Sequence, residues 1–348
     1  MAKKVALKNN RLLDFIQANP NLSSKEIYEG LQGEFAYATV KRLLQGLLLE
    51  KHLQTVGKGK ATRYRISDAY ELLHSIDMDE YFSREIDERE IKSRFNHGIF
   101  DLLENVPLFS GQEMEHLKGL QESYKRNIES LSEAECNKEL ERLAIDLSWK
   151  SSQIEGNTYS LLETERLLKD QQAAAGKTRD EATMLLNHKA AIDFIIAYPQ
   201  HMMRLSIPRI EEIHGLLIKD LPVERNIRVR RVGVSGTNYR PLENEFQIRE
   251  ALEQTCRLVN SLENVFSKAL LSLILLSYIQ AFADGNKRTA RIISNAMLIS
   301  HGYCPLSFRT VDPLVYKKAM LLFYEQNNLA EFKKIFIEQF EFSVRTYF

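Results

Sequence analysis

The sequence has little cysteine and no net charge, and each of these absences excludes a class of protein. Its three cysteines among 348 residues are widely scattered and show no CxxC spacing. This argues against a disulfide-stabilised or zinc-bound fold and is typical of a reducing cytoplasm. A formal net charge of zero creates no overall field toward nucleic acid or membrane. Any such partner must therefore be bound by a local patch.

The sequence also lacks a long apolar run. The most apolar stretch, residues 269–283, contains Ser272, Ser277 and Gln280, and it is shorter than the roughly 20 apolar residues that span a bilayer. The first residues include no apolar region of the kind found in signal peptides. We therefore expect a cytoplasmic protein without a membrane partner, and the length predicts two or three domains.

Residues 1–67 predict a small helical module that ends in a β-hairpin. Apolar spacing predicts three helices, and Ser23 with Glu26 has the pattern of a capping box before the second one. Two short segments, 53–56 and 63–66, flank a turn rich in Gly and Lys. Three helices followed by a hairpin resemble a winged helix-turn-helix.

This module is the basic part of the chain. It holds twelve Lys and Arg against five Asp and Glu, so its formal charge is about +7. The basic residues gather on the third helix and the hairpin, where a winged helix contacts DNA. DNA binding is therefore expected, and docking onto another protein is the alternative. The residues expected to contact DNA are Lys41, Arg42, Lys58, Lys60, Arg63 and Arg65. Residues 68–109 are charge-rich and predict a helical connector without chemistry of its own.

Residues 279–291 form a polar, glycine-containing turn between two helical patterns. The backbone of Gly285 and Asn286 opens the second helix, and Arg288 and Arg291 share one face of its first turn. Two arginines are unfavourable at a helix N-terminus unless an anion joins them, because the helix dipole favours negative charge there. The stretch therefore predicts a phosphate site, and a charged surface turn is the alternative.

The same stretch resembles the signature of the Fic domain family, HxFx(D/E)GN(G/K)RxxR. Gln280 stands where the family has its catalytic histidine. The matching positions are Phe282, Asp284, Gly285, Asn286, Lys287, Arg288 and Arg291. The resemblance implies a mainly α fold in which residues 110–348 form an all-helical Fic core with a β-hairpin flap, preceded by the winged-helix domain.

A second motif lies upstream of the signature. Ser151, Glu155 and Gly156 match the (S/T)xxxE(G/N) inhibitory motif of Fic proteins, in the class whose inhibitory helix precedes the core. The resemblance implies such a helix near residues 147–160. From it, Glu155 would pair with Arg291 and occupy the space of the ATP γ-phosphate. An ordinary capping glutamate is the alternative.

Residues 232–241 predict a short hairpin, since valines alternate before a turn-like Gly-Thr-Asn sequence. In Fic proteins a β-hairpin flap in this place aligns the target by strand addition. The flap residues implied are Val232, Val234, Gly236, Thr237 and Tyr239.

The family transfers AMP from ATP to a Ser, Thr or Tyr hydroxyl of a target protein. The resemblance implies that Asp284 holds Mg²⁺ and that Asn286, Arg288 and the 285–287 backbone, which includes Lys287, hold phosphates. Arg291 would orient the γ-phosphate.

Gln280 cannot replace the histidine, because a carboxamide has no useful proton affinity near neutral pH. General-base catalysis is worth roughly 10²–10⁴-fold, so we predict an intact ATP site with weak or lost transfer. The nearby His188, His201 and His214 are expected to be structural, because none lies in the signature.

Three functions follow. The first is an adenylyltransferase scaffold, autoinhibited by Glu155 and weakened at Gln280. The second is an ATP-sensing, DNA-binding transcriptional regulator, and the third is a Fic enzyme that removes AMP. The aromatic C-terminus fits either packing onto the core or self-association as a homodimer, and it contains Phe336, Phe340, Tyr347 and Phe348.

Overall fold

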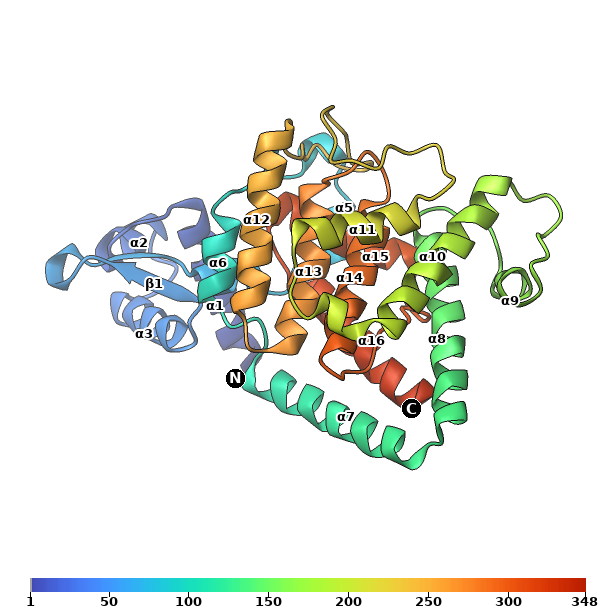
Figure 1. Cartoon of the computed structure of the whole chain (residues 1–348). Helices are drawn as coiled ribbons and strands as arrows, with labels where there is room; N and C mark the ends of the chain where they lie inside the picture. The colour runs from blue at the N-terminus through green and yellow to red at the C-terminus, as the bar shows by residue number, and fades with distance from the viewer. Residues whose placement is uncertain (1) are drawn as a thin grey trace. The chain divides into compact units, whose positions relative to one another are not determined.

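The structure is a computed structural model that describes residues 2–348, with side chains from residue 8 onward. The chain is mainly helical (Figure 1). It divides into two compact units. Unit 1 contains the residues up to 75 together with 105–107, and unit 2 contains 76–104 and 108–348.

Unit 1 has the expected order of helices followed by a hairpin. The second helix begins with the predicted capping box, in which Ser23 and Glu26 each bond the other's backbone N–H. Strands β1 and β2 pair antiparallel with Leu53 opposite Ile66. The elements are α1 (Ala2–Ala18), α2 (Ser24–Gly30), α3 (Tyr37–Leu49), β1 (Leu53–Val56), the 3₁₀ turn η1 (Gly59–Ala61), β2 (Arg63–Ile66) and α4 (Asp68–Leu73).

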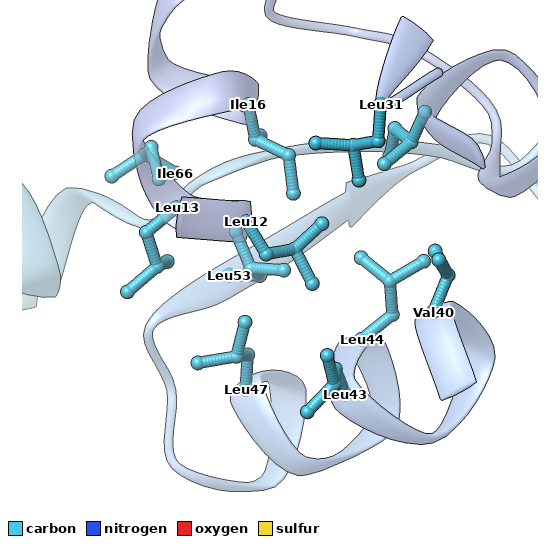
Figure 2. Close-up of a cluster of buried hydrophobic side chains, with 11 residues drawn as sticks. Leu12, Leu13, Ile16, Leu31, Val40, Leu43, Leu44, Leu47, Leu53 and Ile66 are labelled. Atoms are coloured by element: carbon cyan, nitrogen blue, oxygen red, sulfur yellow. The ribbon is translucent and has the colours of Figure 1, made fainter. Parts of the chain in front are cut away.

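The core of unit 1 is a cluster of aliphatic side chains contributed by its first three helices and both strands (Figure 2). On α3 the buried positions recur at the three- and four-residue spacing of an amphipathic helix. The fully buried members are Leu12, Leu13, Ile16, Ile27, Leu31, Val40, Leu43, Leu44, Leu47, Leu53 and Ile66.

Unit 2 is built almost wholly of helices. They are α5 (Met78–Phe82), η2 (Ile86–Glu88), α6 (Ile99–Asn105), α7 (Gly111–Ser130), α8 (Glu133–Ile154), α9 (Leu161–Asp170), α10 (Arg179–Ala197), η3 (Pro199–Met202), α11 (Ile207–Leu217), α12 (Glu245–Ser261), α13 (Val265–Ile279), α14 (Asn286–Ser300), α15 (Pro313–Gln326) and α16 (Ala330–Tyr347).

Helix α13 lies at the centre of unit 2 (Figure 1). Every one of its residues is buried, as expected for a helix that is apolar on all sides. It packs against α12, α14 and α15, and α14 packs in turn against α8, α10 and α11. The loop 280–285 joins α13 to α14, so the signature stretch lies between the two most buried helices.

The segment 83–98 is not the helical connector that the sequence predicts. Apart from η2 it has little helix, and parts of its backbone bond to distant segments. The N–H of Lys92 donates to the carbonyl of Glu325 (2.8 Å), and the carbonyl of Ser93 accepts from the N–H of Arg240 (3.0 Å). These tertiary bonds replace the bonds that a helix would make within itself.

The expected hairpin at 232–241 is also wrong. Within the described residues, the two-stranded sheet of unit 1 is the one sheet, and residues 231–239 pair with no strand. Val232 and Val234 are half-buried with exposed neighbours, so the alternation does mark an extended segment. No second strand lies opposite it, because the chain beyond the turn is held elsewhere by the buried Tyr239.

The C-terminal aromatic residues of α16 pack onto the core. Phe336, Phe340 and Tyr347 are buried, and the Tyr347 hydroxyl donates to Asp146 of α8 (2.6 Å). These side chains therefore offer no exposed apolar face for a homodimer. Among the helices described here, none combines the length and apolarity needed to cross a bilayer.

We predict that Leu44→Ala lowers the free energy of unfolding by about 2–5 kcal/mol, because it leaves a cavity in the core of unit 1. Leu49 lies on the same helix but is 86% exposed, whereas Leu44 is 1% exposed. The matched control Leu49→Ala should cost less than about 0.5 kcal/mol. Urea unfolding followed by circular dichroism measures both, and equal losses would contradict the described core.

Candidate functional site

A cavity of about 510 Å³ lies beside the loop that joins α13 to α14. Its wall includes the loop, the first turn of α14, the extended residues 232–236 and one side of α15. Gln280, Asp284 and Glu155 all line it. The structure therefore gathers the signature, the inhibitory motif and part of the expected flap around one space.

The N-terminus of α14 opens toward this cavity without a side-chain cap. Gly285 occupies the N-cap in the left-handed region (φ 81°), which glycine adopts at no steric cost. The Asn286 side chain instead closes the loop on itself, accepting from the N–H of Phe282 and donating to the carbonyl of Phe282, both at 2.8 Å. The helix thus presents uncapped N–H groups, which is the arrangement that binds anions.

Arg288 carries an unsatisfied donor at the same place. Its side chain is buried, and its Nη1 has no hydrogen-bond partner among the described residues. Its Nη2 pairs with the exposed Asp284 (3.2 Å). Burial lowers the pKa of Arg288, although the carboxylates of Asp284 and Glu155 oppose that effect. A buried guanidinium with a spare donor is the group that a phosphate oxygen would satisfy.

Arg291 is fully buried and is held by the last turn of α8. Its Nη2 donates to Glu155 Oε1 (2.9 Å) and to the carbonyl of Ser151 (2.9 Å). Its Nε donates to the Ser151 hydroxyl (2.8 Å). The Glu155–Arg291 contact expected from the two motifs is therefore present.

Glu155 is the C-cap of α8 and is not inside a helix, because α8 ends at Ile154. The expected helix at 147–160 thus stops early, and Gly156 turns the chain with φ of 102°. Lys287 is a second cation for Glu155, with Nζ at 3.5 Å from Oε2. Burial opposes ionisation of Glu155, but Arg291 and Lys287 outweigh it and hold its pKa below the ordinary value.

His188 lies behind this ion pair and not in the cavity. It is fully buried on α10, and its Nε2 is 2.6 Å from the Ser151 hydroxyl that also accepts from Arg291. Burial, together with Arg291 and Arg288, lowers the pKa of His188 well below its ordinary value. His188 therefore orients Ser151 as a neutral ring and does not replace the missing base.

His214 packs against the signature loop. Its ring stacks on Phe282 at 3.6 Å between centroids, and its Nε2 lies 3.0 Å from the carbonyl of Asp284. His201 is remote from the cavity lining and contacts Glu212 (2.6 Å). All three histidines have structural contacts.

Gln280 faces inward from the end of α13. It has a left-handed backbone (φ 53°), and its amide nitrogen donates to the carbonyl of Ser277 (2.6 Å) and to the hydroxyl of Tyr324 (3.3 Å). These contacts fix the amide as a donor. The amide oxygen is left as a hydrogen-bond acceptor, but a carboxamide oxygen has no useful proton affinity near neutral pH and cannot serve as a base.

Arg228 is a site residue that sequence reasoning missed. It is 2% exposed, and its guanidinium donates to three carbonyls: Gln280 (2.6 Å), Arg230 (2.8 Å) and Leu242 (2.6 Å). It joins both ends of the segment 230–242 to the signature loop. No local pattern marks such a residue, because its partners are backbone oxygens distant in sequence.

The implied flap residues have different environments. Val232, Val234 and Gly236 line the cavity, whereas Tyr239 is buried and stacks on Tyr278 at 4.9 Å between centroids. Thr237 accepts from the N–H of Tyr239 through its hydroxyl (3.1 Å). Tyr239 thus anchors the segment and does not form an edge.

Asp284 is the carboxylate of the signature loop and the one residue predicted to bind metal. No group of three or more potential metal ligands occurs in the part of the chain that the structure describes. A lone carboxylate such as Asp284 would therefore suit a cation that takes most of its oxygen ligands from phosphates and water, as Mg²⁺ does.

The residues predicted to contact DNA lie on α3 and on the hairpin with its turn. Arg63 pairs with Glu26, and Arg65 lies 3.7 Å from Asp68. Lys41 lies over the ring of Tyr37 (5.0 Å). Arg42, Lys58 and Lys60 are exposed.

Comparison with known proteins finds similarity to one family. Residues 204–298 match the model of the Fic/DOC family. The protein adenylyltransferase Fic of Drosophila grimshawi is 30% identical over 161 residues, which cover 44% of this chain and 32% of that protein. The Drosophila ananassae protein of the same name is 29% identical over 158 residues, with 44% and 31% covered. The chain thus spans about a third of the length of the curated relatives it matches.

Solved structures agree on the fold. Fic-1 (residues 134–508) from C. elegans superimposes with a TM-score of 0.58 at 20% identity, covering 68% of this chain and 72% of that one. A Fic domain containing signaling protein from Bacteroides thetaiotaomicron gives 0.57 at 18% identity, covering 66% and 94%. The mainly helical Fic fold expected from the sequence is confirmed.

We predict that Glu155→Gln lowers the free energy of unfolding by about 1–3 kcal/mol near neutral pH, because it leaves Arg291 buried without its anion. Folding lowers the pKa of Glu155 from its ordinary 4.5. The stabilisation is therefore present above that value and is lost as the pH falls through the lowered pKa.

The measurement is urea unfolding of wild type and Glu155→Gln from about pH 7 down to about pH 3, over which the difference should shrink. Glu165→Gln is the control, since Glu165 makes an exposed pair with Lys169 worth less than about 0.5 kcal/mol. A difference that stays constant with pH would argue against an ionised Glu155.

Proposed function

We propose that this chain is a Fic-type protein whose unit 2 binds ATP and is an autoinhibited adenylyltransferase scaffold with weak or lost transfer. The observation that carries the proposal is the convergence at one cavity of an uncapped helix N-terminus, the spare donor of buried Arg288, and Glu155, which binds Arg291 behind it. The Fic/DOC match and the adenylyltransferase relatives support this assignment.

The triphosphate would lie against the first turn of α14. The N–H groups after Gly285 and the free Nη1 of Arg288 are donors for phosphate oxygens, and Lys287 adds charge at the same end. The Asn286 side chain is engaged by Phe282, so its contribution is to hold the loop that aims these N–H groups.

Asp284 is the residue that would hold Mg²⁺ beside the phosphates. Its carboxylate is exposed and contacts the guanidinium of Arg288 alone among the ion pairs described. Mg²⁺ would neutralise phosphate charge there when bound. Its Oδ2 pairs with Arg288, so Oδ1 is the oxygen that would be available to the cation.

Autoinhibition follows from competition for Arg291. A carboxylate and a γ-phosphate are both anions that match a guanidinium fork, and Glu155 already accepts from Nη2 of the buried Arg291. Both charges of the pair are desolvated, so removal of Glu155 alone leaves a strong anion site. ATP would then bind with its γ-phosphate in the place of Glu155.

Gln280 limits the chemical step. A target hydroxyl must lose a proton as it attacks the α-phosphate, and the carboxamide of Gln280 has no useful proton affinity near neutral pH with which to take it. We expect transfer to be slower by roughly 10²–10⁴-fold than with a histidine base.

We predict that the pair of changes Glu155→Gly and Gln280→His restores transfer. Intact mass and labelled ATP would measure self-modification of wild type, both single variants and the double variant. The double variant should exceed wild type by roughly 10²-fold or more, whereas each single variant remains limited by the other defect.

Strong self-modification by Glu155→Gly alone would show that Gln280 does not disable the site. No transfer by the double variant, with ATP bound, would contradict the transferase assignment. Loss of AMP from a modified protein on incubation with the wild type would instead favour the AMP-removing alternative.

A second function is favoured by the charge of unit 1. We infer that residues 1–67 are a winged helix-turn-helix that binds DNA, which would make the chain an ATP-responsive regulator. The exposed Arg42, Lys58 and Lys60 lie on α3 and the turn between the strands, where such a fold contacts phosphates. Arg63 and Arg65 are partly engaged by Glu26 and Asp68, so they contribute less free charge.

We predict salt-dependent binding of the full chain to duplex DNA. The double change Lys58→Ala and Lys60→Ala should reduce the slope of log affinity against log salt by about 2, one for each lost phosphate contact. Lys25→Ala is the control, because Lys25 lies on α2 beside Glu29 (3.6 Å). A slope unchanged by the double variant would contradict phosphate contacts at the hairpin.

A further inference from the structure

The segment 81–96, which we call the strap, runs beside α15 and the flap segment 232–241. It is fixed to α15 at several points. The N–H of Lys92 donates to the carbonyl of Glu325 (2.8 Å), and Lys92 Nζ donates to the carbonyl of Gln326 (3.0 Å). The N–H of Asn96 donates to the hydroxyl of Tyr278 on α13 (3.0 Å). The strap is therefore a fixed part of unit 2.

Three hydrogen bonds join the strap to one half of the flap segment. Arg89 Nη2 donates to the carbonyl of Gly236 (2.9 Å). Asn238 Nδ2 donates to Asp87 (2.8 Å). A backbone bond, from the Arg240 N–H to the Ser93 carbonyl (3.0 Å), is the third. Residues 236–240 are thus held at every second position.

The other half of the flap segment is free of such bonds. Within the described chain, no backbone–backbone hydrogen bond is made by residues 229–235. All of residues 232–235 line the cavity, and Gly233 and Ser235 are also exposed. Gly236, with φ of 86°, is the turn at which the free half meets the held half.

Arg89 is the residue that holds this turn. Its Nη1 lies 3.2 Å from Glu325 Oε1, and the two side chains are 4% and 0% exposed. Tyr81 donates to the other oxygen of Glu325 (2.7 Å), and the Arg89 guanidinium lies 5.1 Å from the centre of the Phe82 ring. Arg89 Nε and Nη1 have no hydrogen-bond partner among the described residues, so the contact with Glu325 is an ion pair. The ion pair and the ring contact orient the guanidinium, and its Nη2 donates to the Gly236 carbonyl.

A buried ion pair is by itself weak evidence for stability, because desolvation offsets much of the attraction. Here the ion pair matters because it fixes the orientation of the Arg89 guanidinium. The planar fork places one nitrogen beside an acid of α15 and donates from the other to a backbone oxygen of the flap segment, and a lysine could not reproduce that arrangement.

We propose that Arg89 is a positioning residue for the flap segment: it fixes the turn at Gly236 so that residues 232–235 extend along the mouth of the cavity with their backbone free. The inference rests on the proposed function only in treating 232–235 as the edge that meets a target. The holding of Gly236 by Arg89 is testable without any activity.

The test is hydrogen exchange in the full chain carrying Arg89→Met together with Glu325→Gln. The double change removes the ion pair without leaving a buried charge, and Gln can still accept from Tyr81. Exchange of the amides of residues 236–240, including the Arg240 N–H bonded to Ser93, should become roughly tenfold faster. Exchange in α13 and α14 should not change.

Arg84→Met is the matched control, because Arg84 lies on the same segment but is exposed and 3.8 Å from Glu80. A second variant, Asp87→Ala, removes only the exposed contact to Asn238, so it tests the strap even if the buried change impairs folding. It should accelerate exchange in the same region by a smaller factor.

Unchanged exchange of residues 236–240 in both variants would overturn the proposal. Acceleration spread evenly over unit 2 in the Arg89 variant, with none from Asp87→Ala, would also overturn it, since the role would then be general stability. ATP binding to Glu155→Gly is measured alongside. Its absence would count against the proposed function, while the exchange result would still decide the role of Arg89.

Discussion

The site depends on how a fully buried arginine is satisfied. Arg291 lies in the first turns of a helix whose dipole disfavours a cation, so an anion has to be near it. Glu155 supplies that anion from the end of α8, and Ser151 takes two further donors of the same guanidinium. The same contact joins the end of α8 to α14 at the wall of the cavity, where Ser151 also meets the buried His188.

The same constraint explains why the site is suited to exchange one anion for another. Glu155 ends its helix at a glycine, so its side chain projects from a cap and is not locked within a turn. Next to it, within the described residues, the spare donor of Arg288 has no hydrogen-bond partner and no side chain caps the N-terminus of α14. Such donors are costly when buried, and a phosphate chain would satisfy them together.

The Glu155–Arg291 contact could be predicted because the sequence contains both the signature and the inhibitory motif. Each motif is weak alone, but together they indicate which glutamate meets which arginine. The central helix α13 was predictable from its unbroken apolar run. The hairpin prediction was wrong, because alternating valines indicate an extended segment but do not show whether a partner strand lies opposite it. Arg228 and Arg89 could not be found from sequence, because both bind backbone carbonyls that tertiary structure alone brings near. The helical connector expected over residues 68–109 is interrupted and α6 begins only at Ile99, because the strap before it bonds to α15 and the flap segment instead.

The central claim is that Glu155 occupies the place of the ATP γ-phosphate at Arg291. The most direct measurement is calorimetric binding of ATP and of ADP to wild type and to Glu155→Gly in the presence of Mg²⁺. The account predicts that removal of Glu155 strengthens ATP binding much more than ADP binding, because only ATP carries the competing phosphate. An equal gain for both nucleotides, or no gain for either, would contradict it.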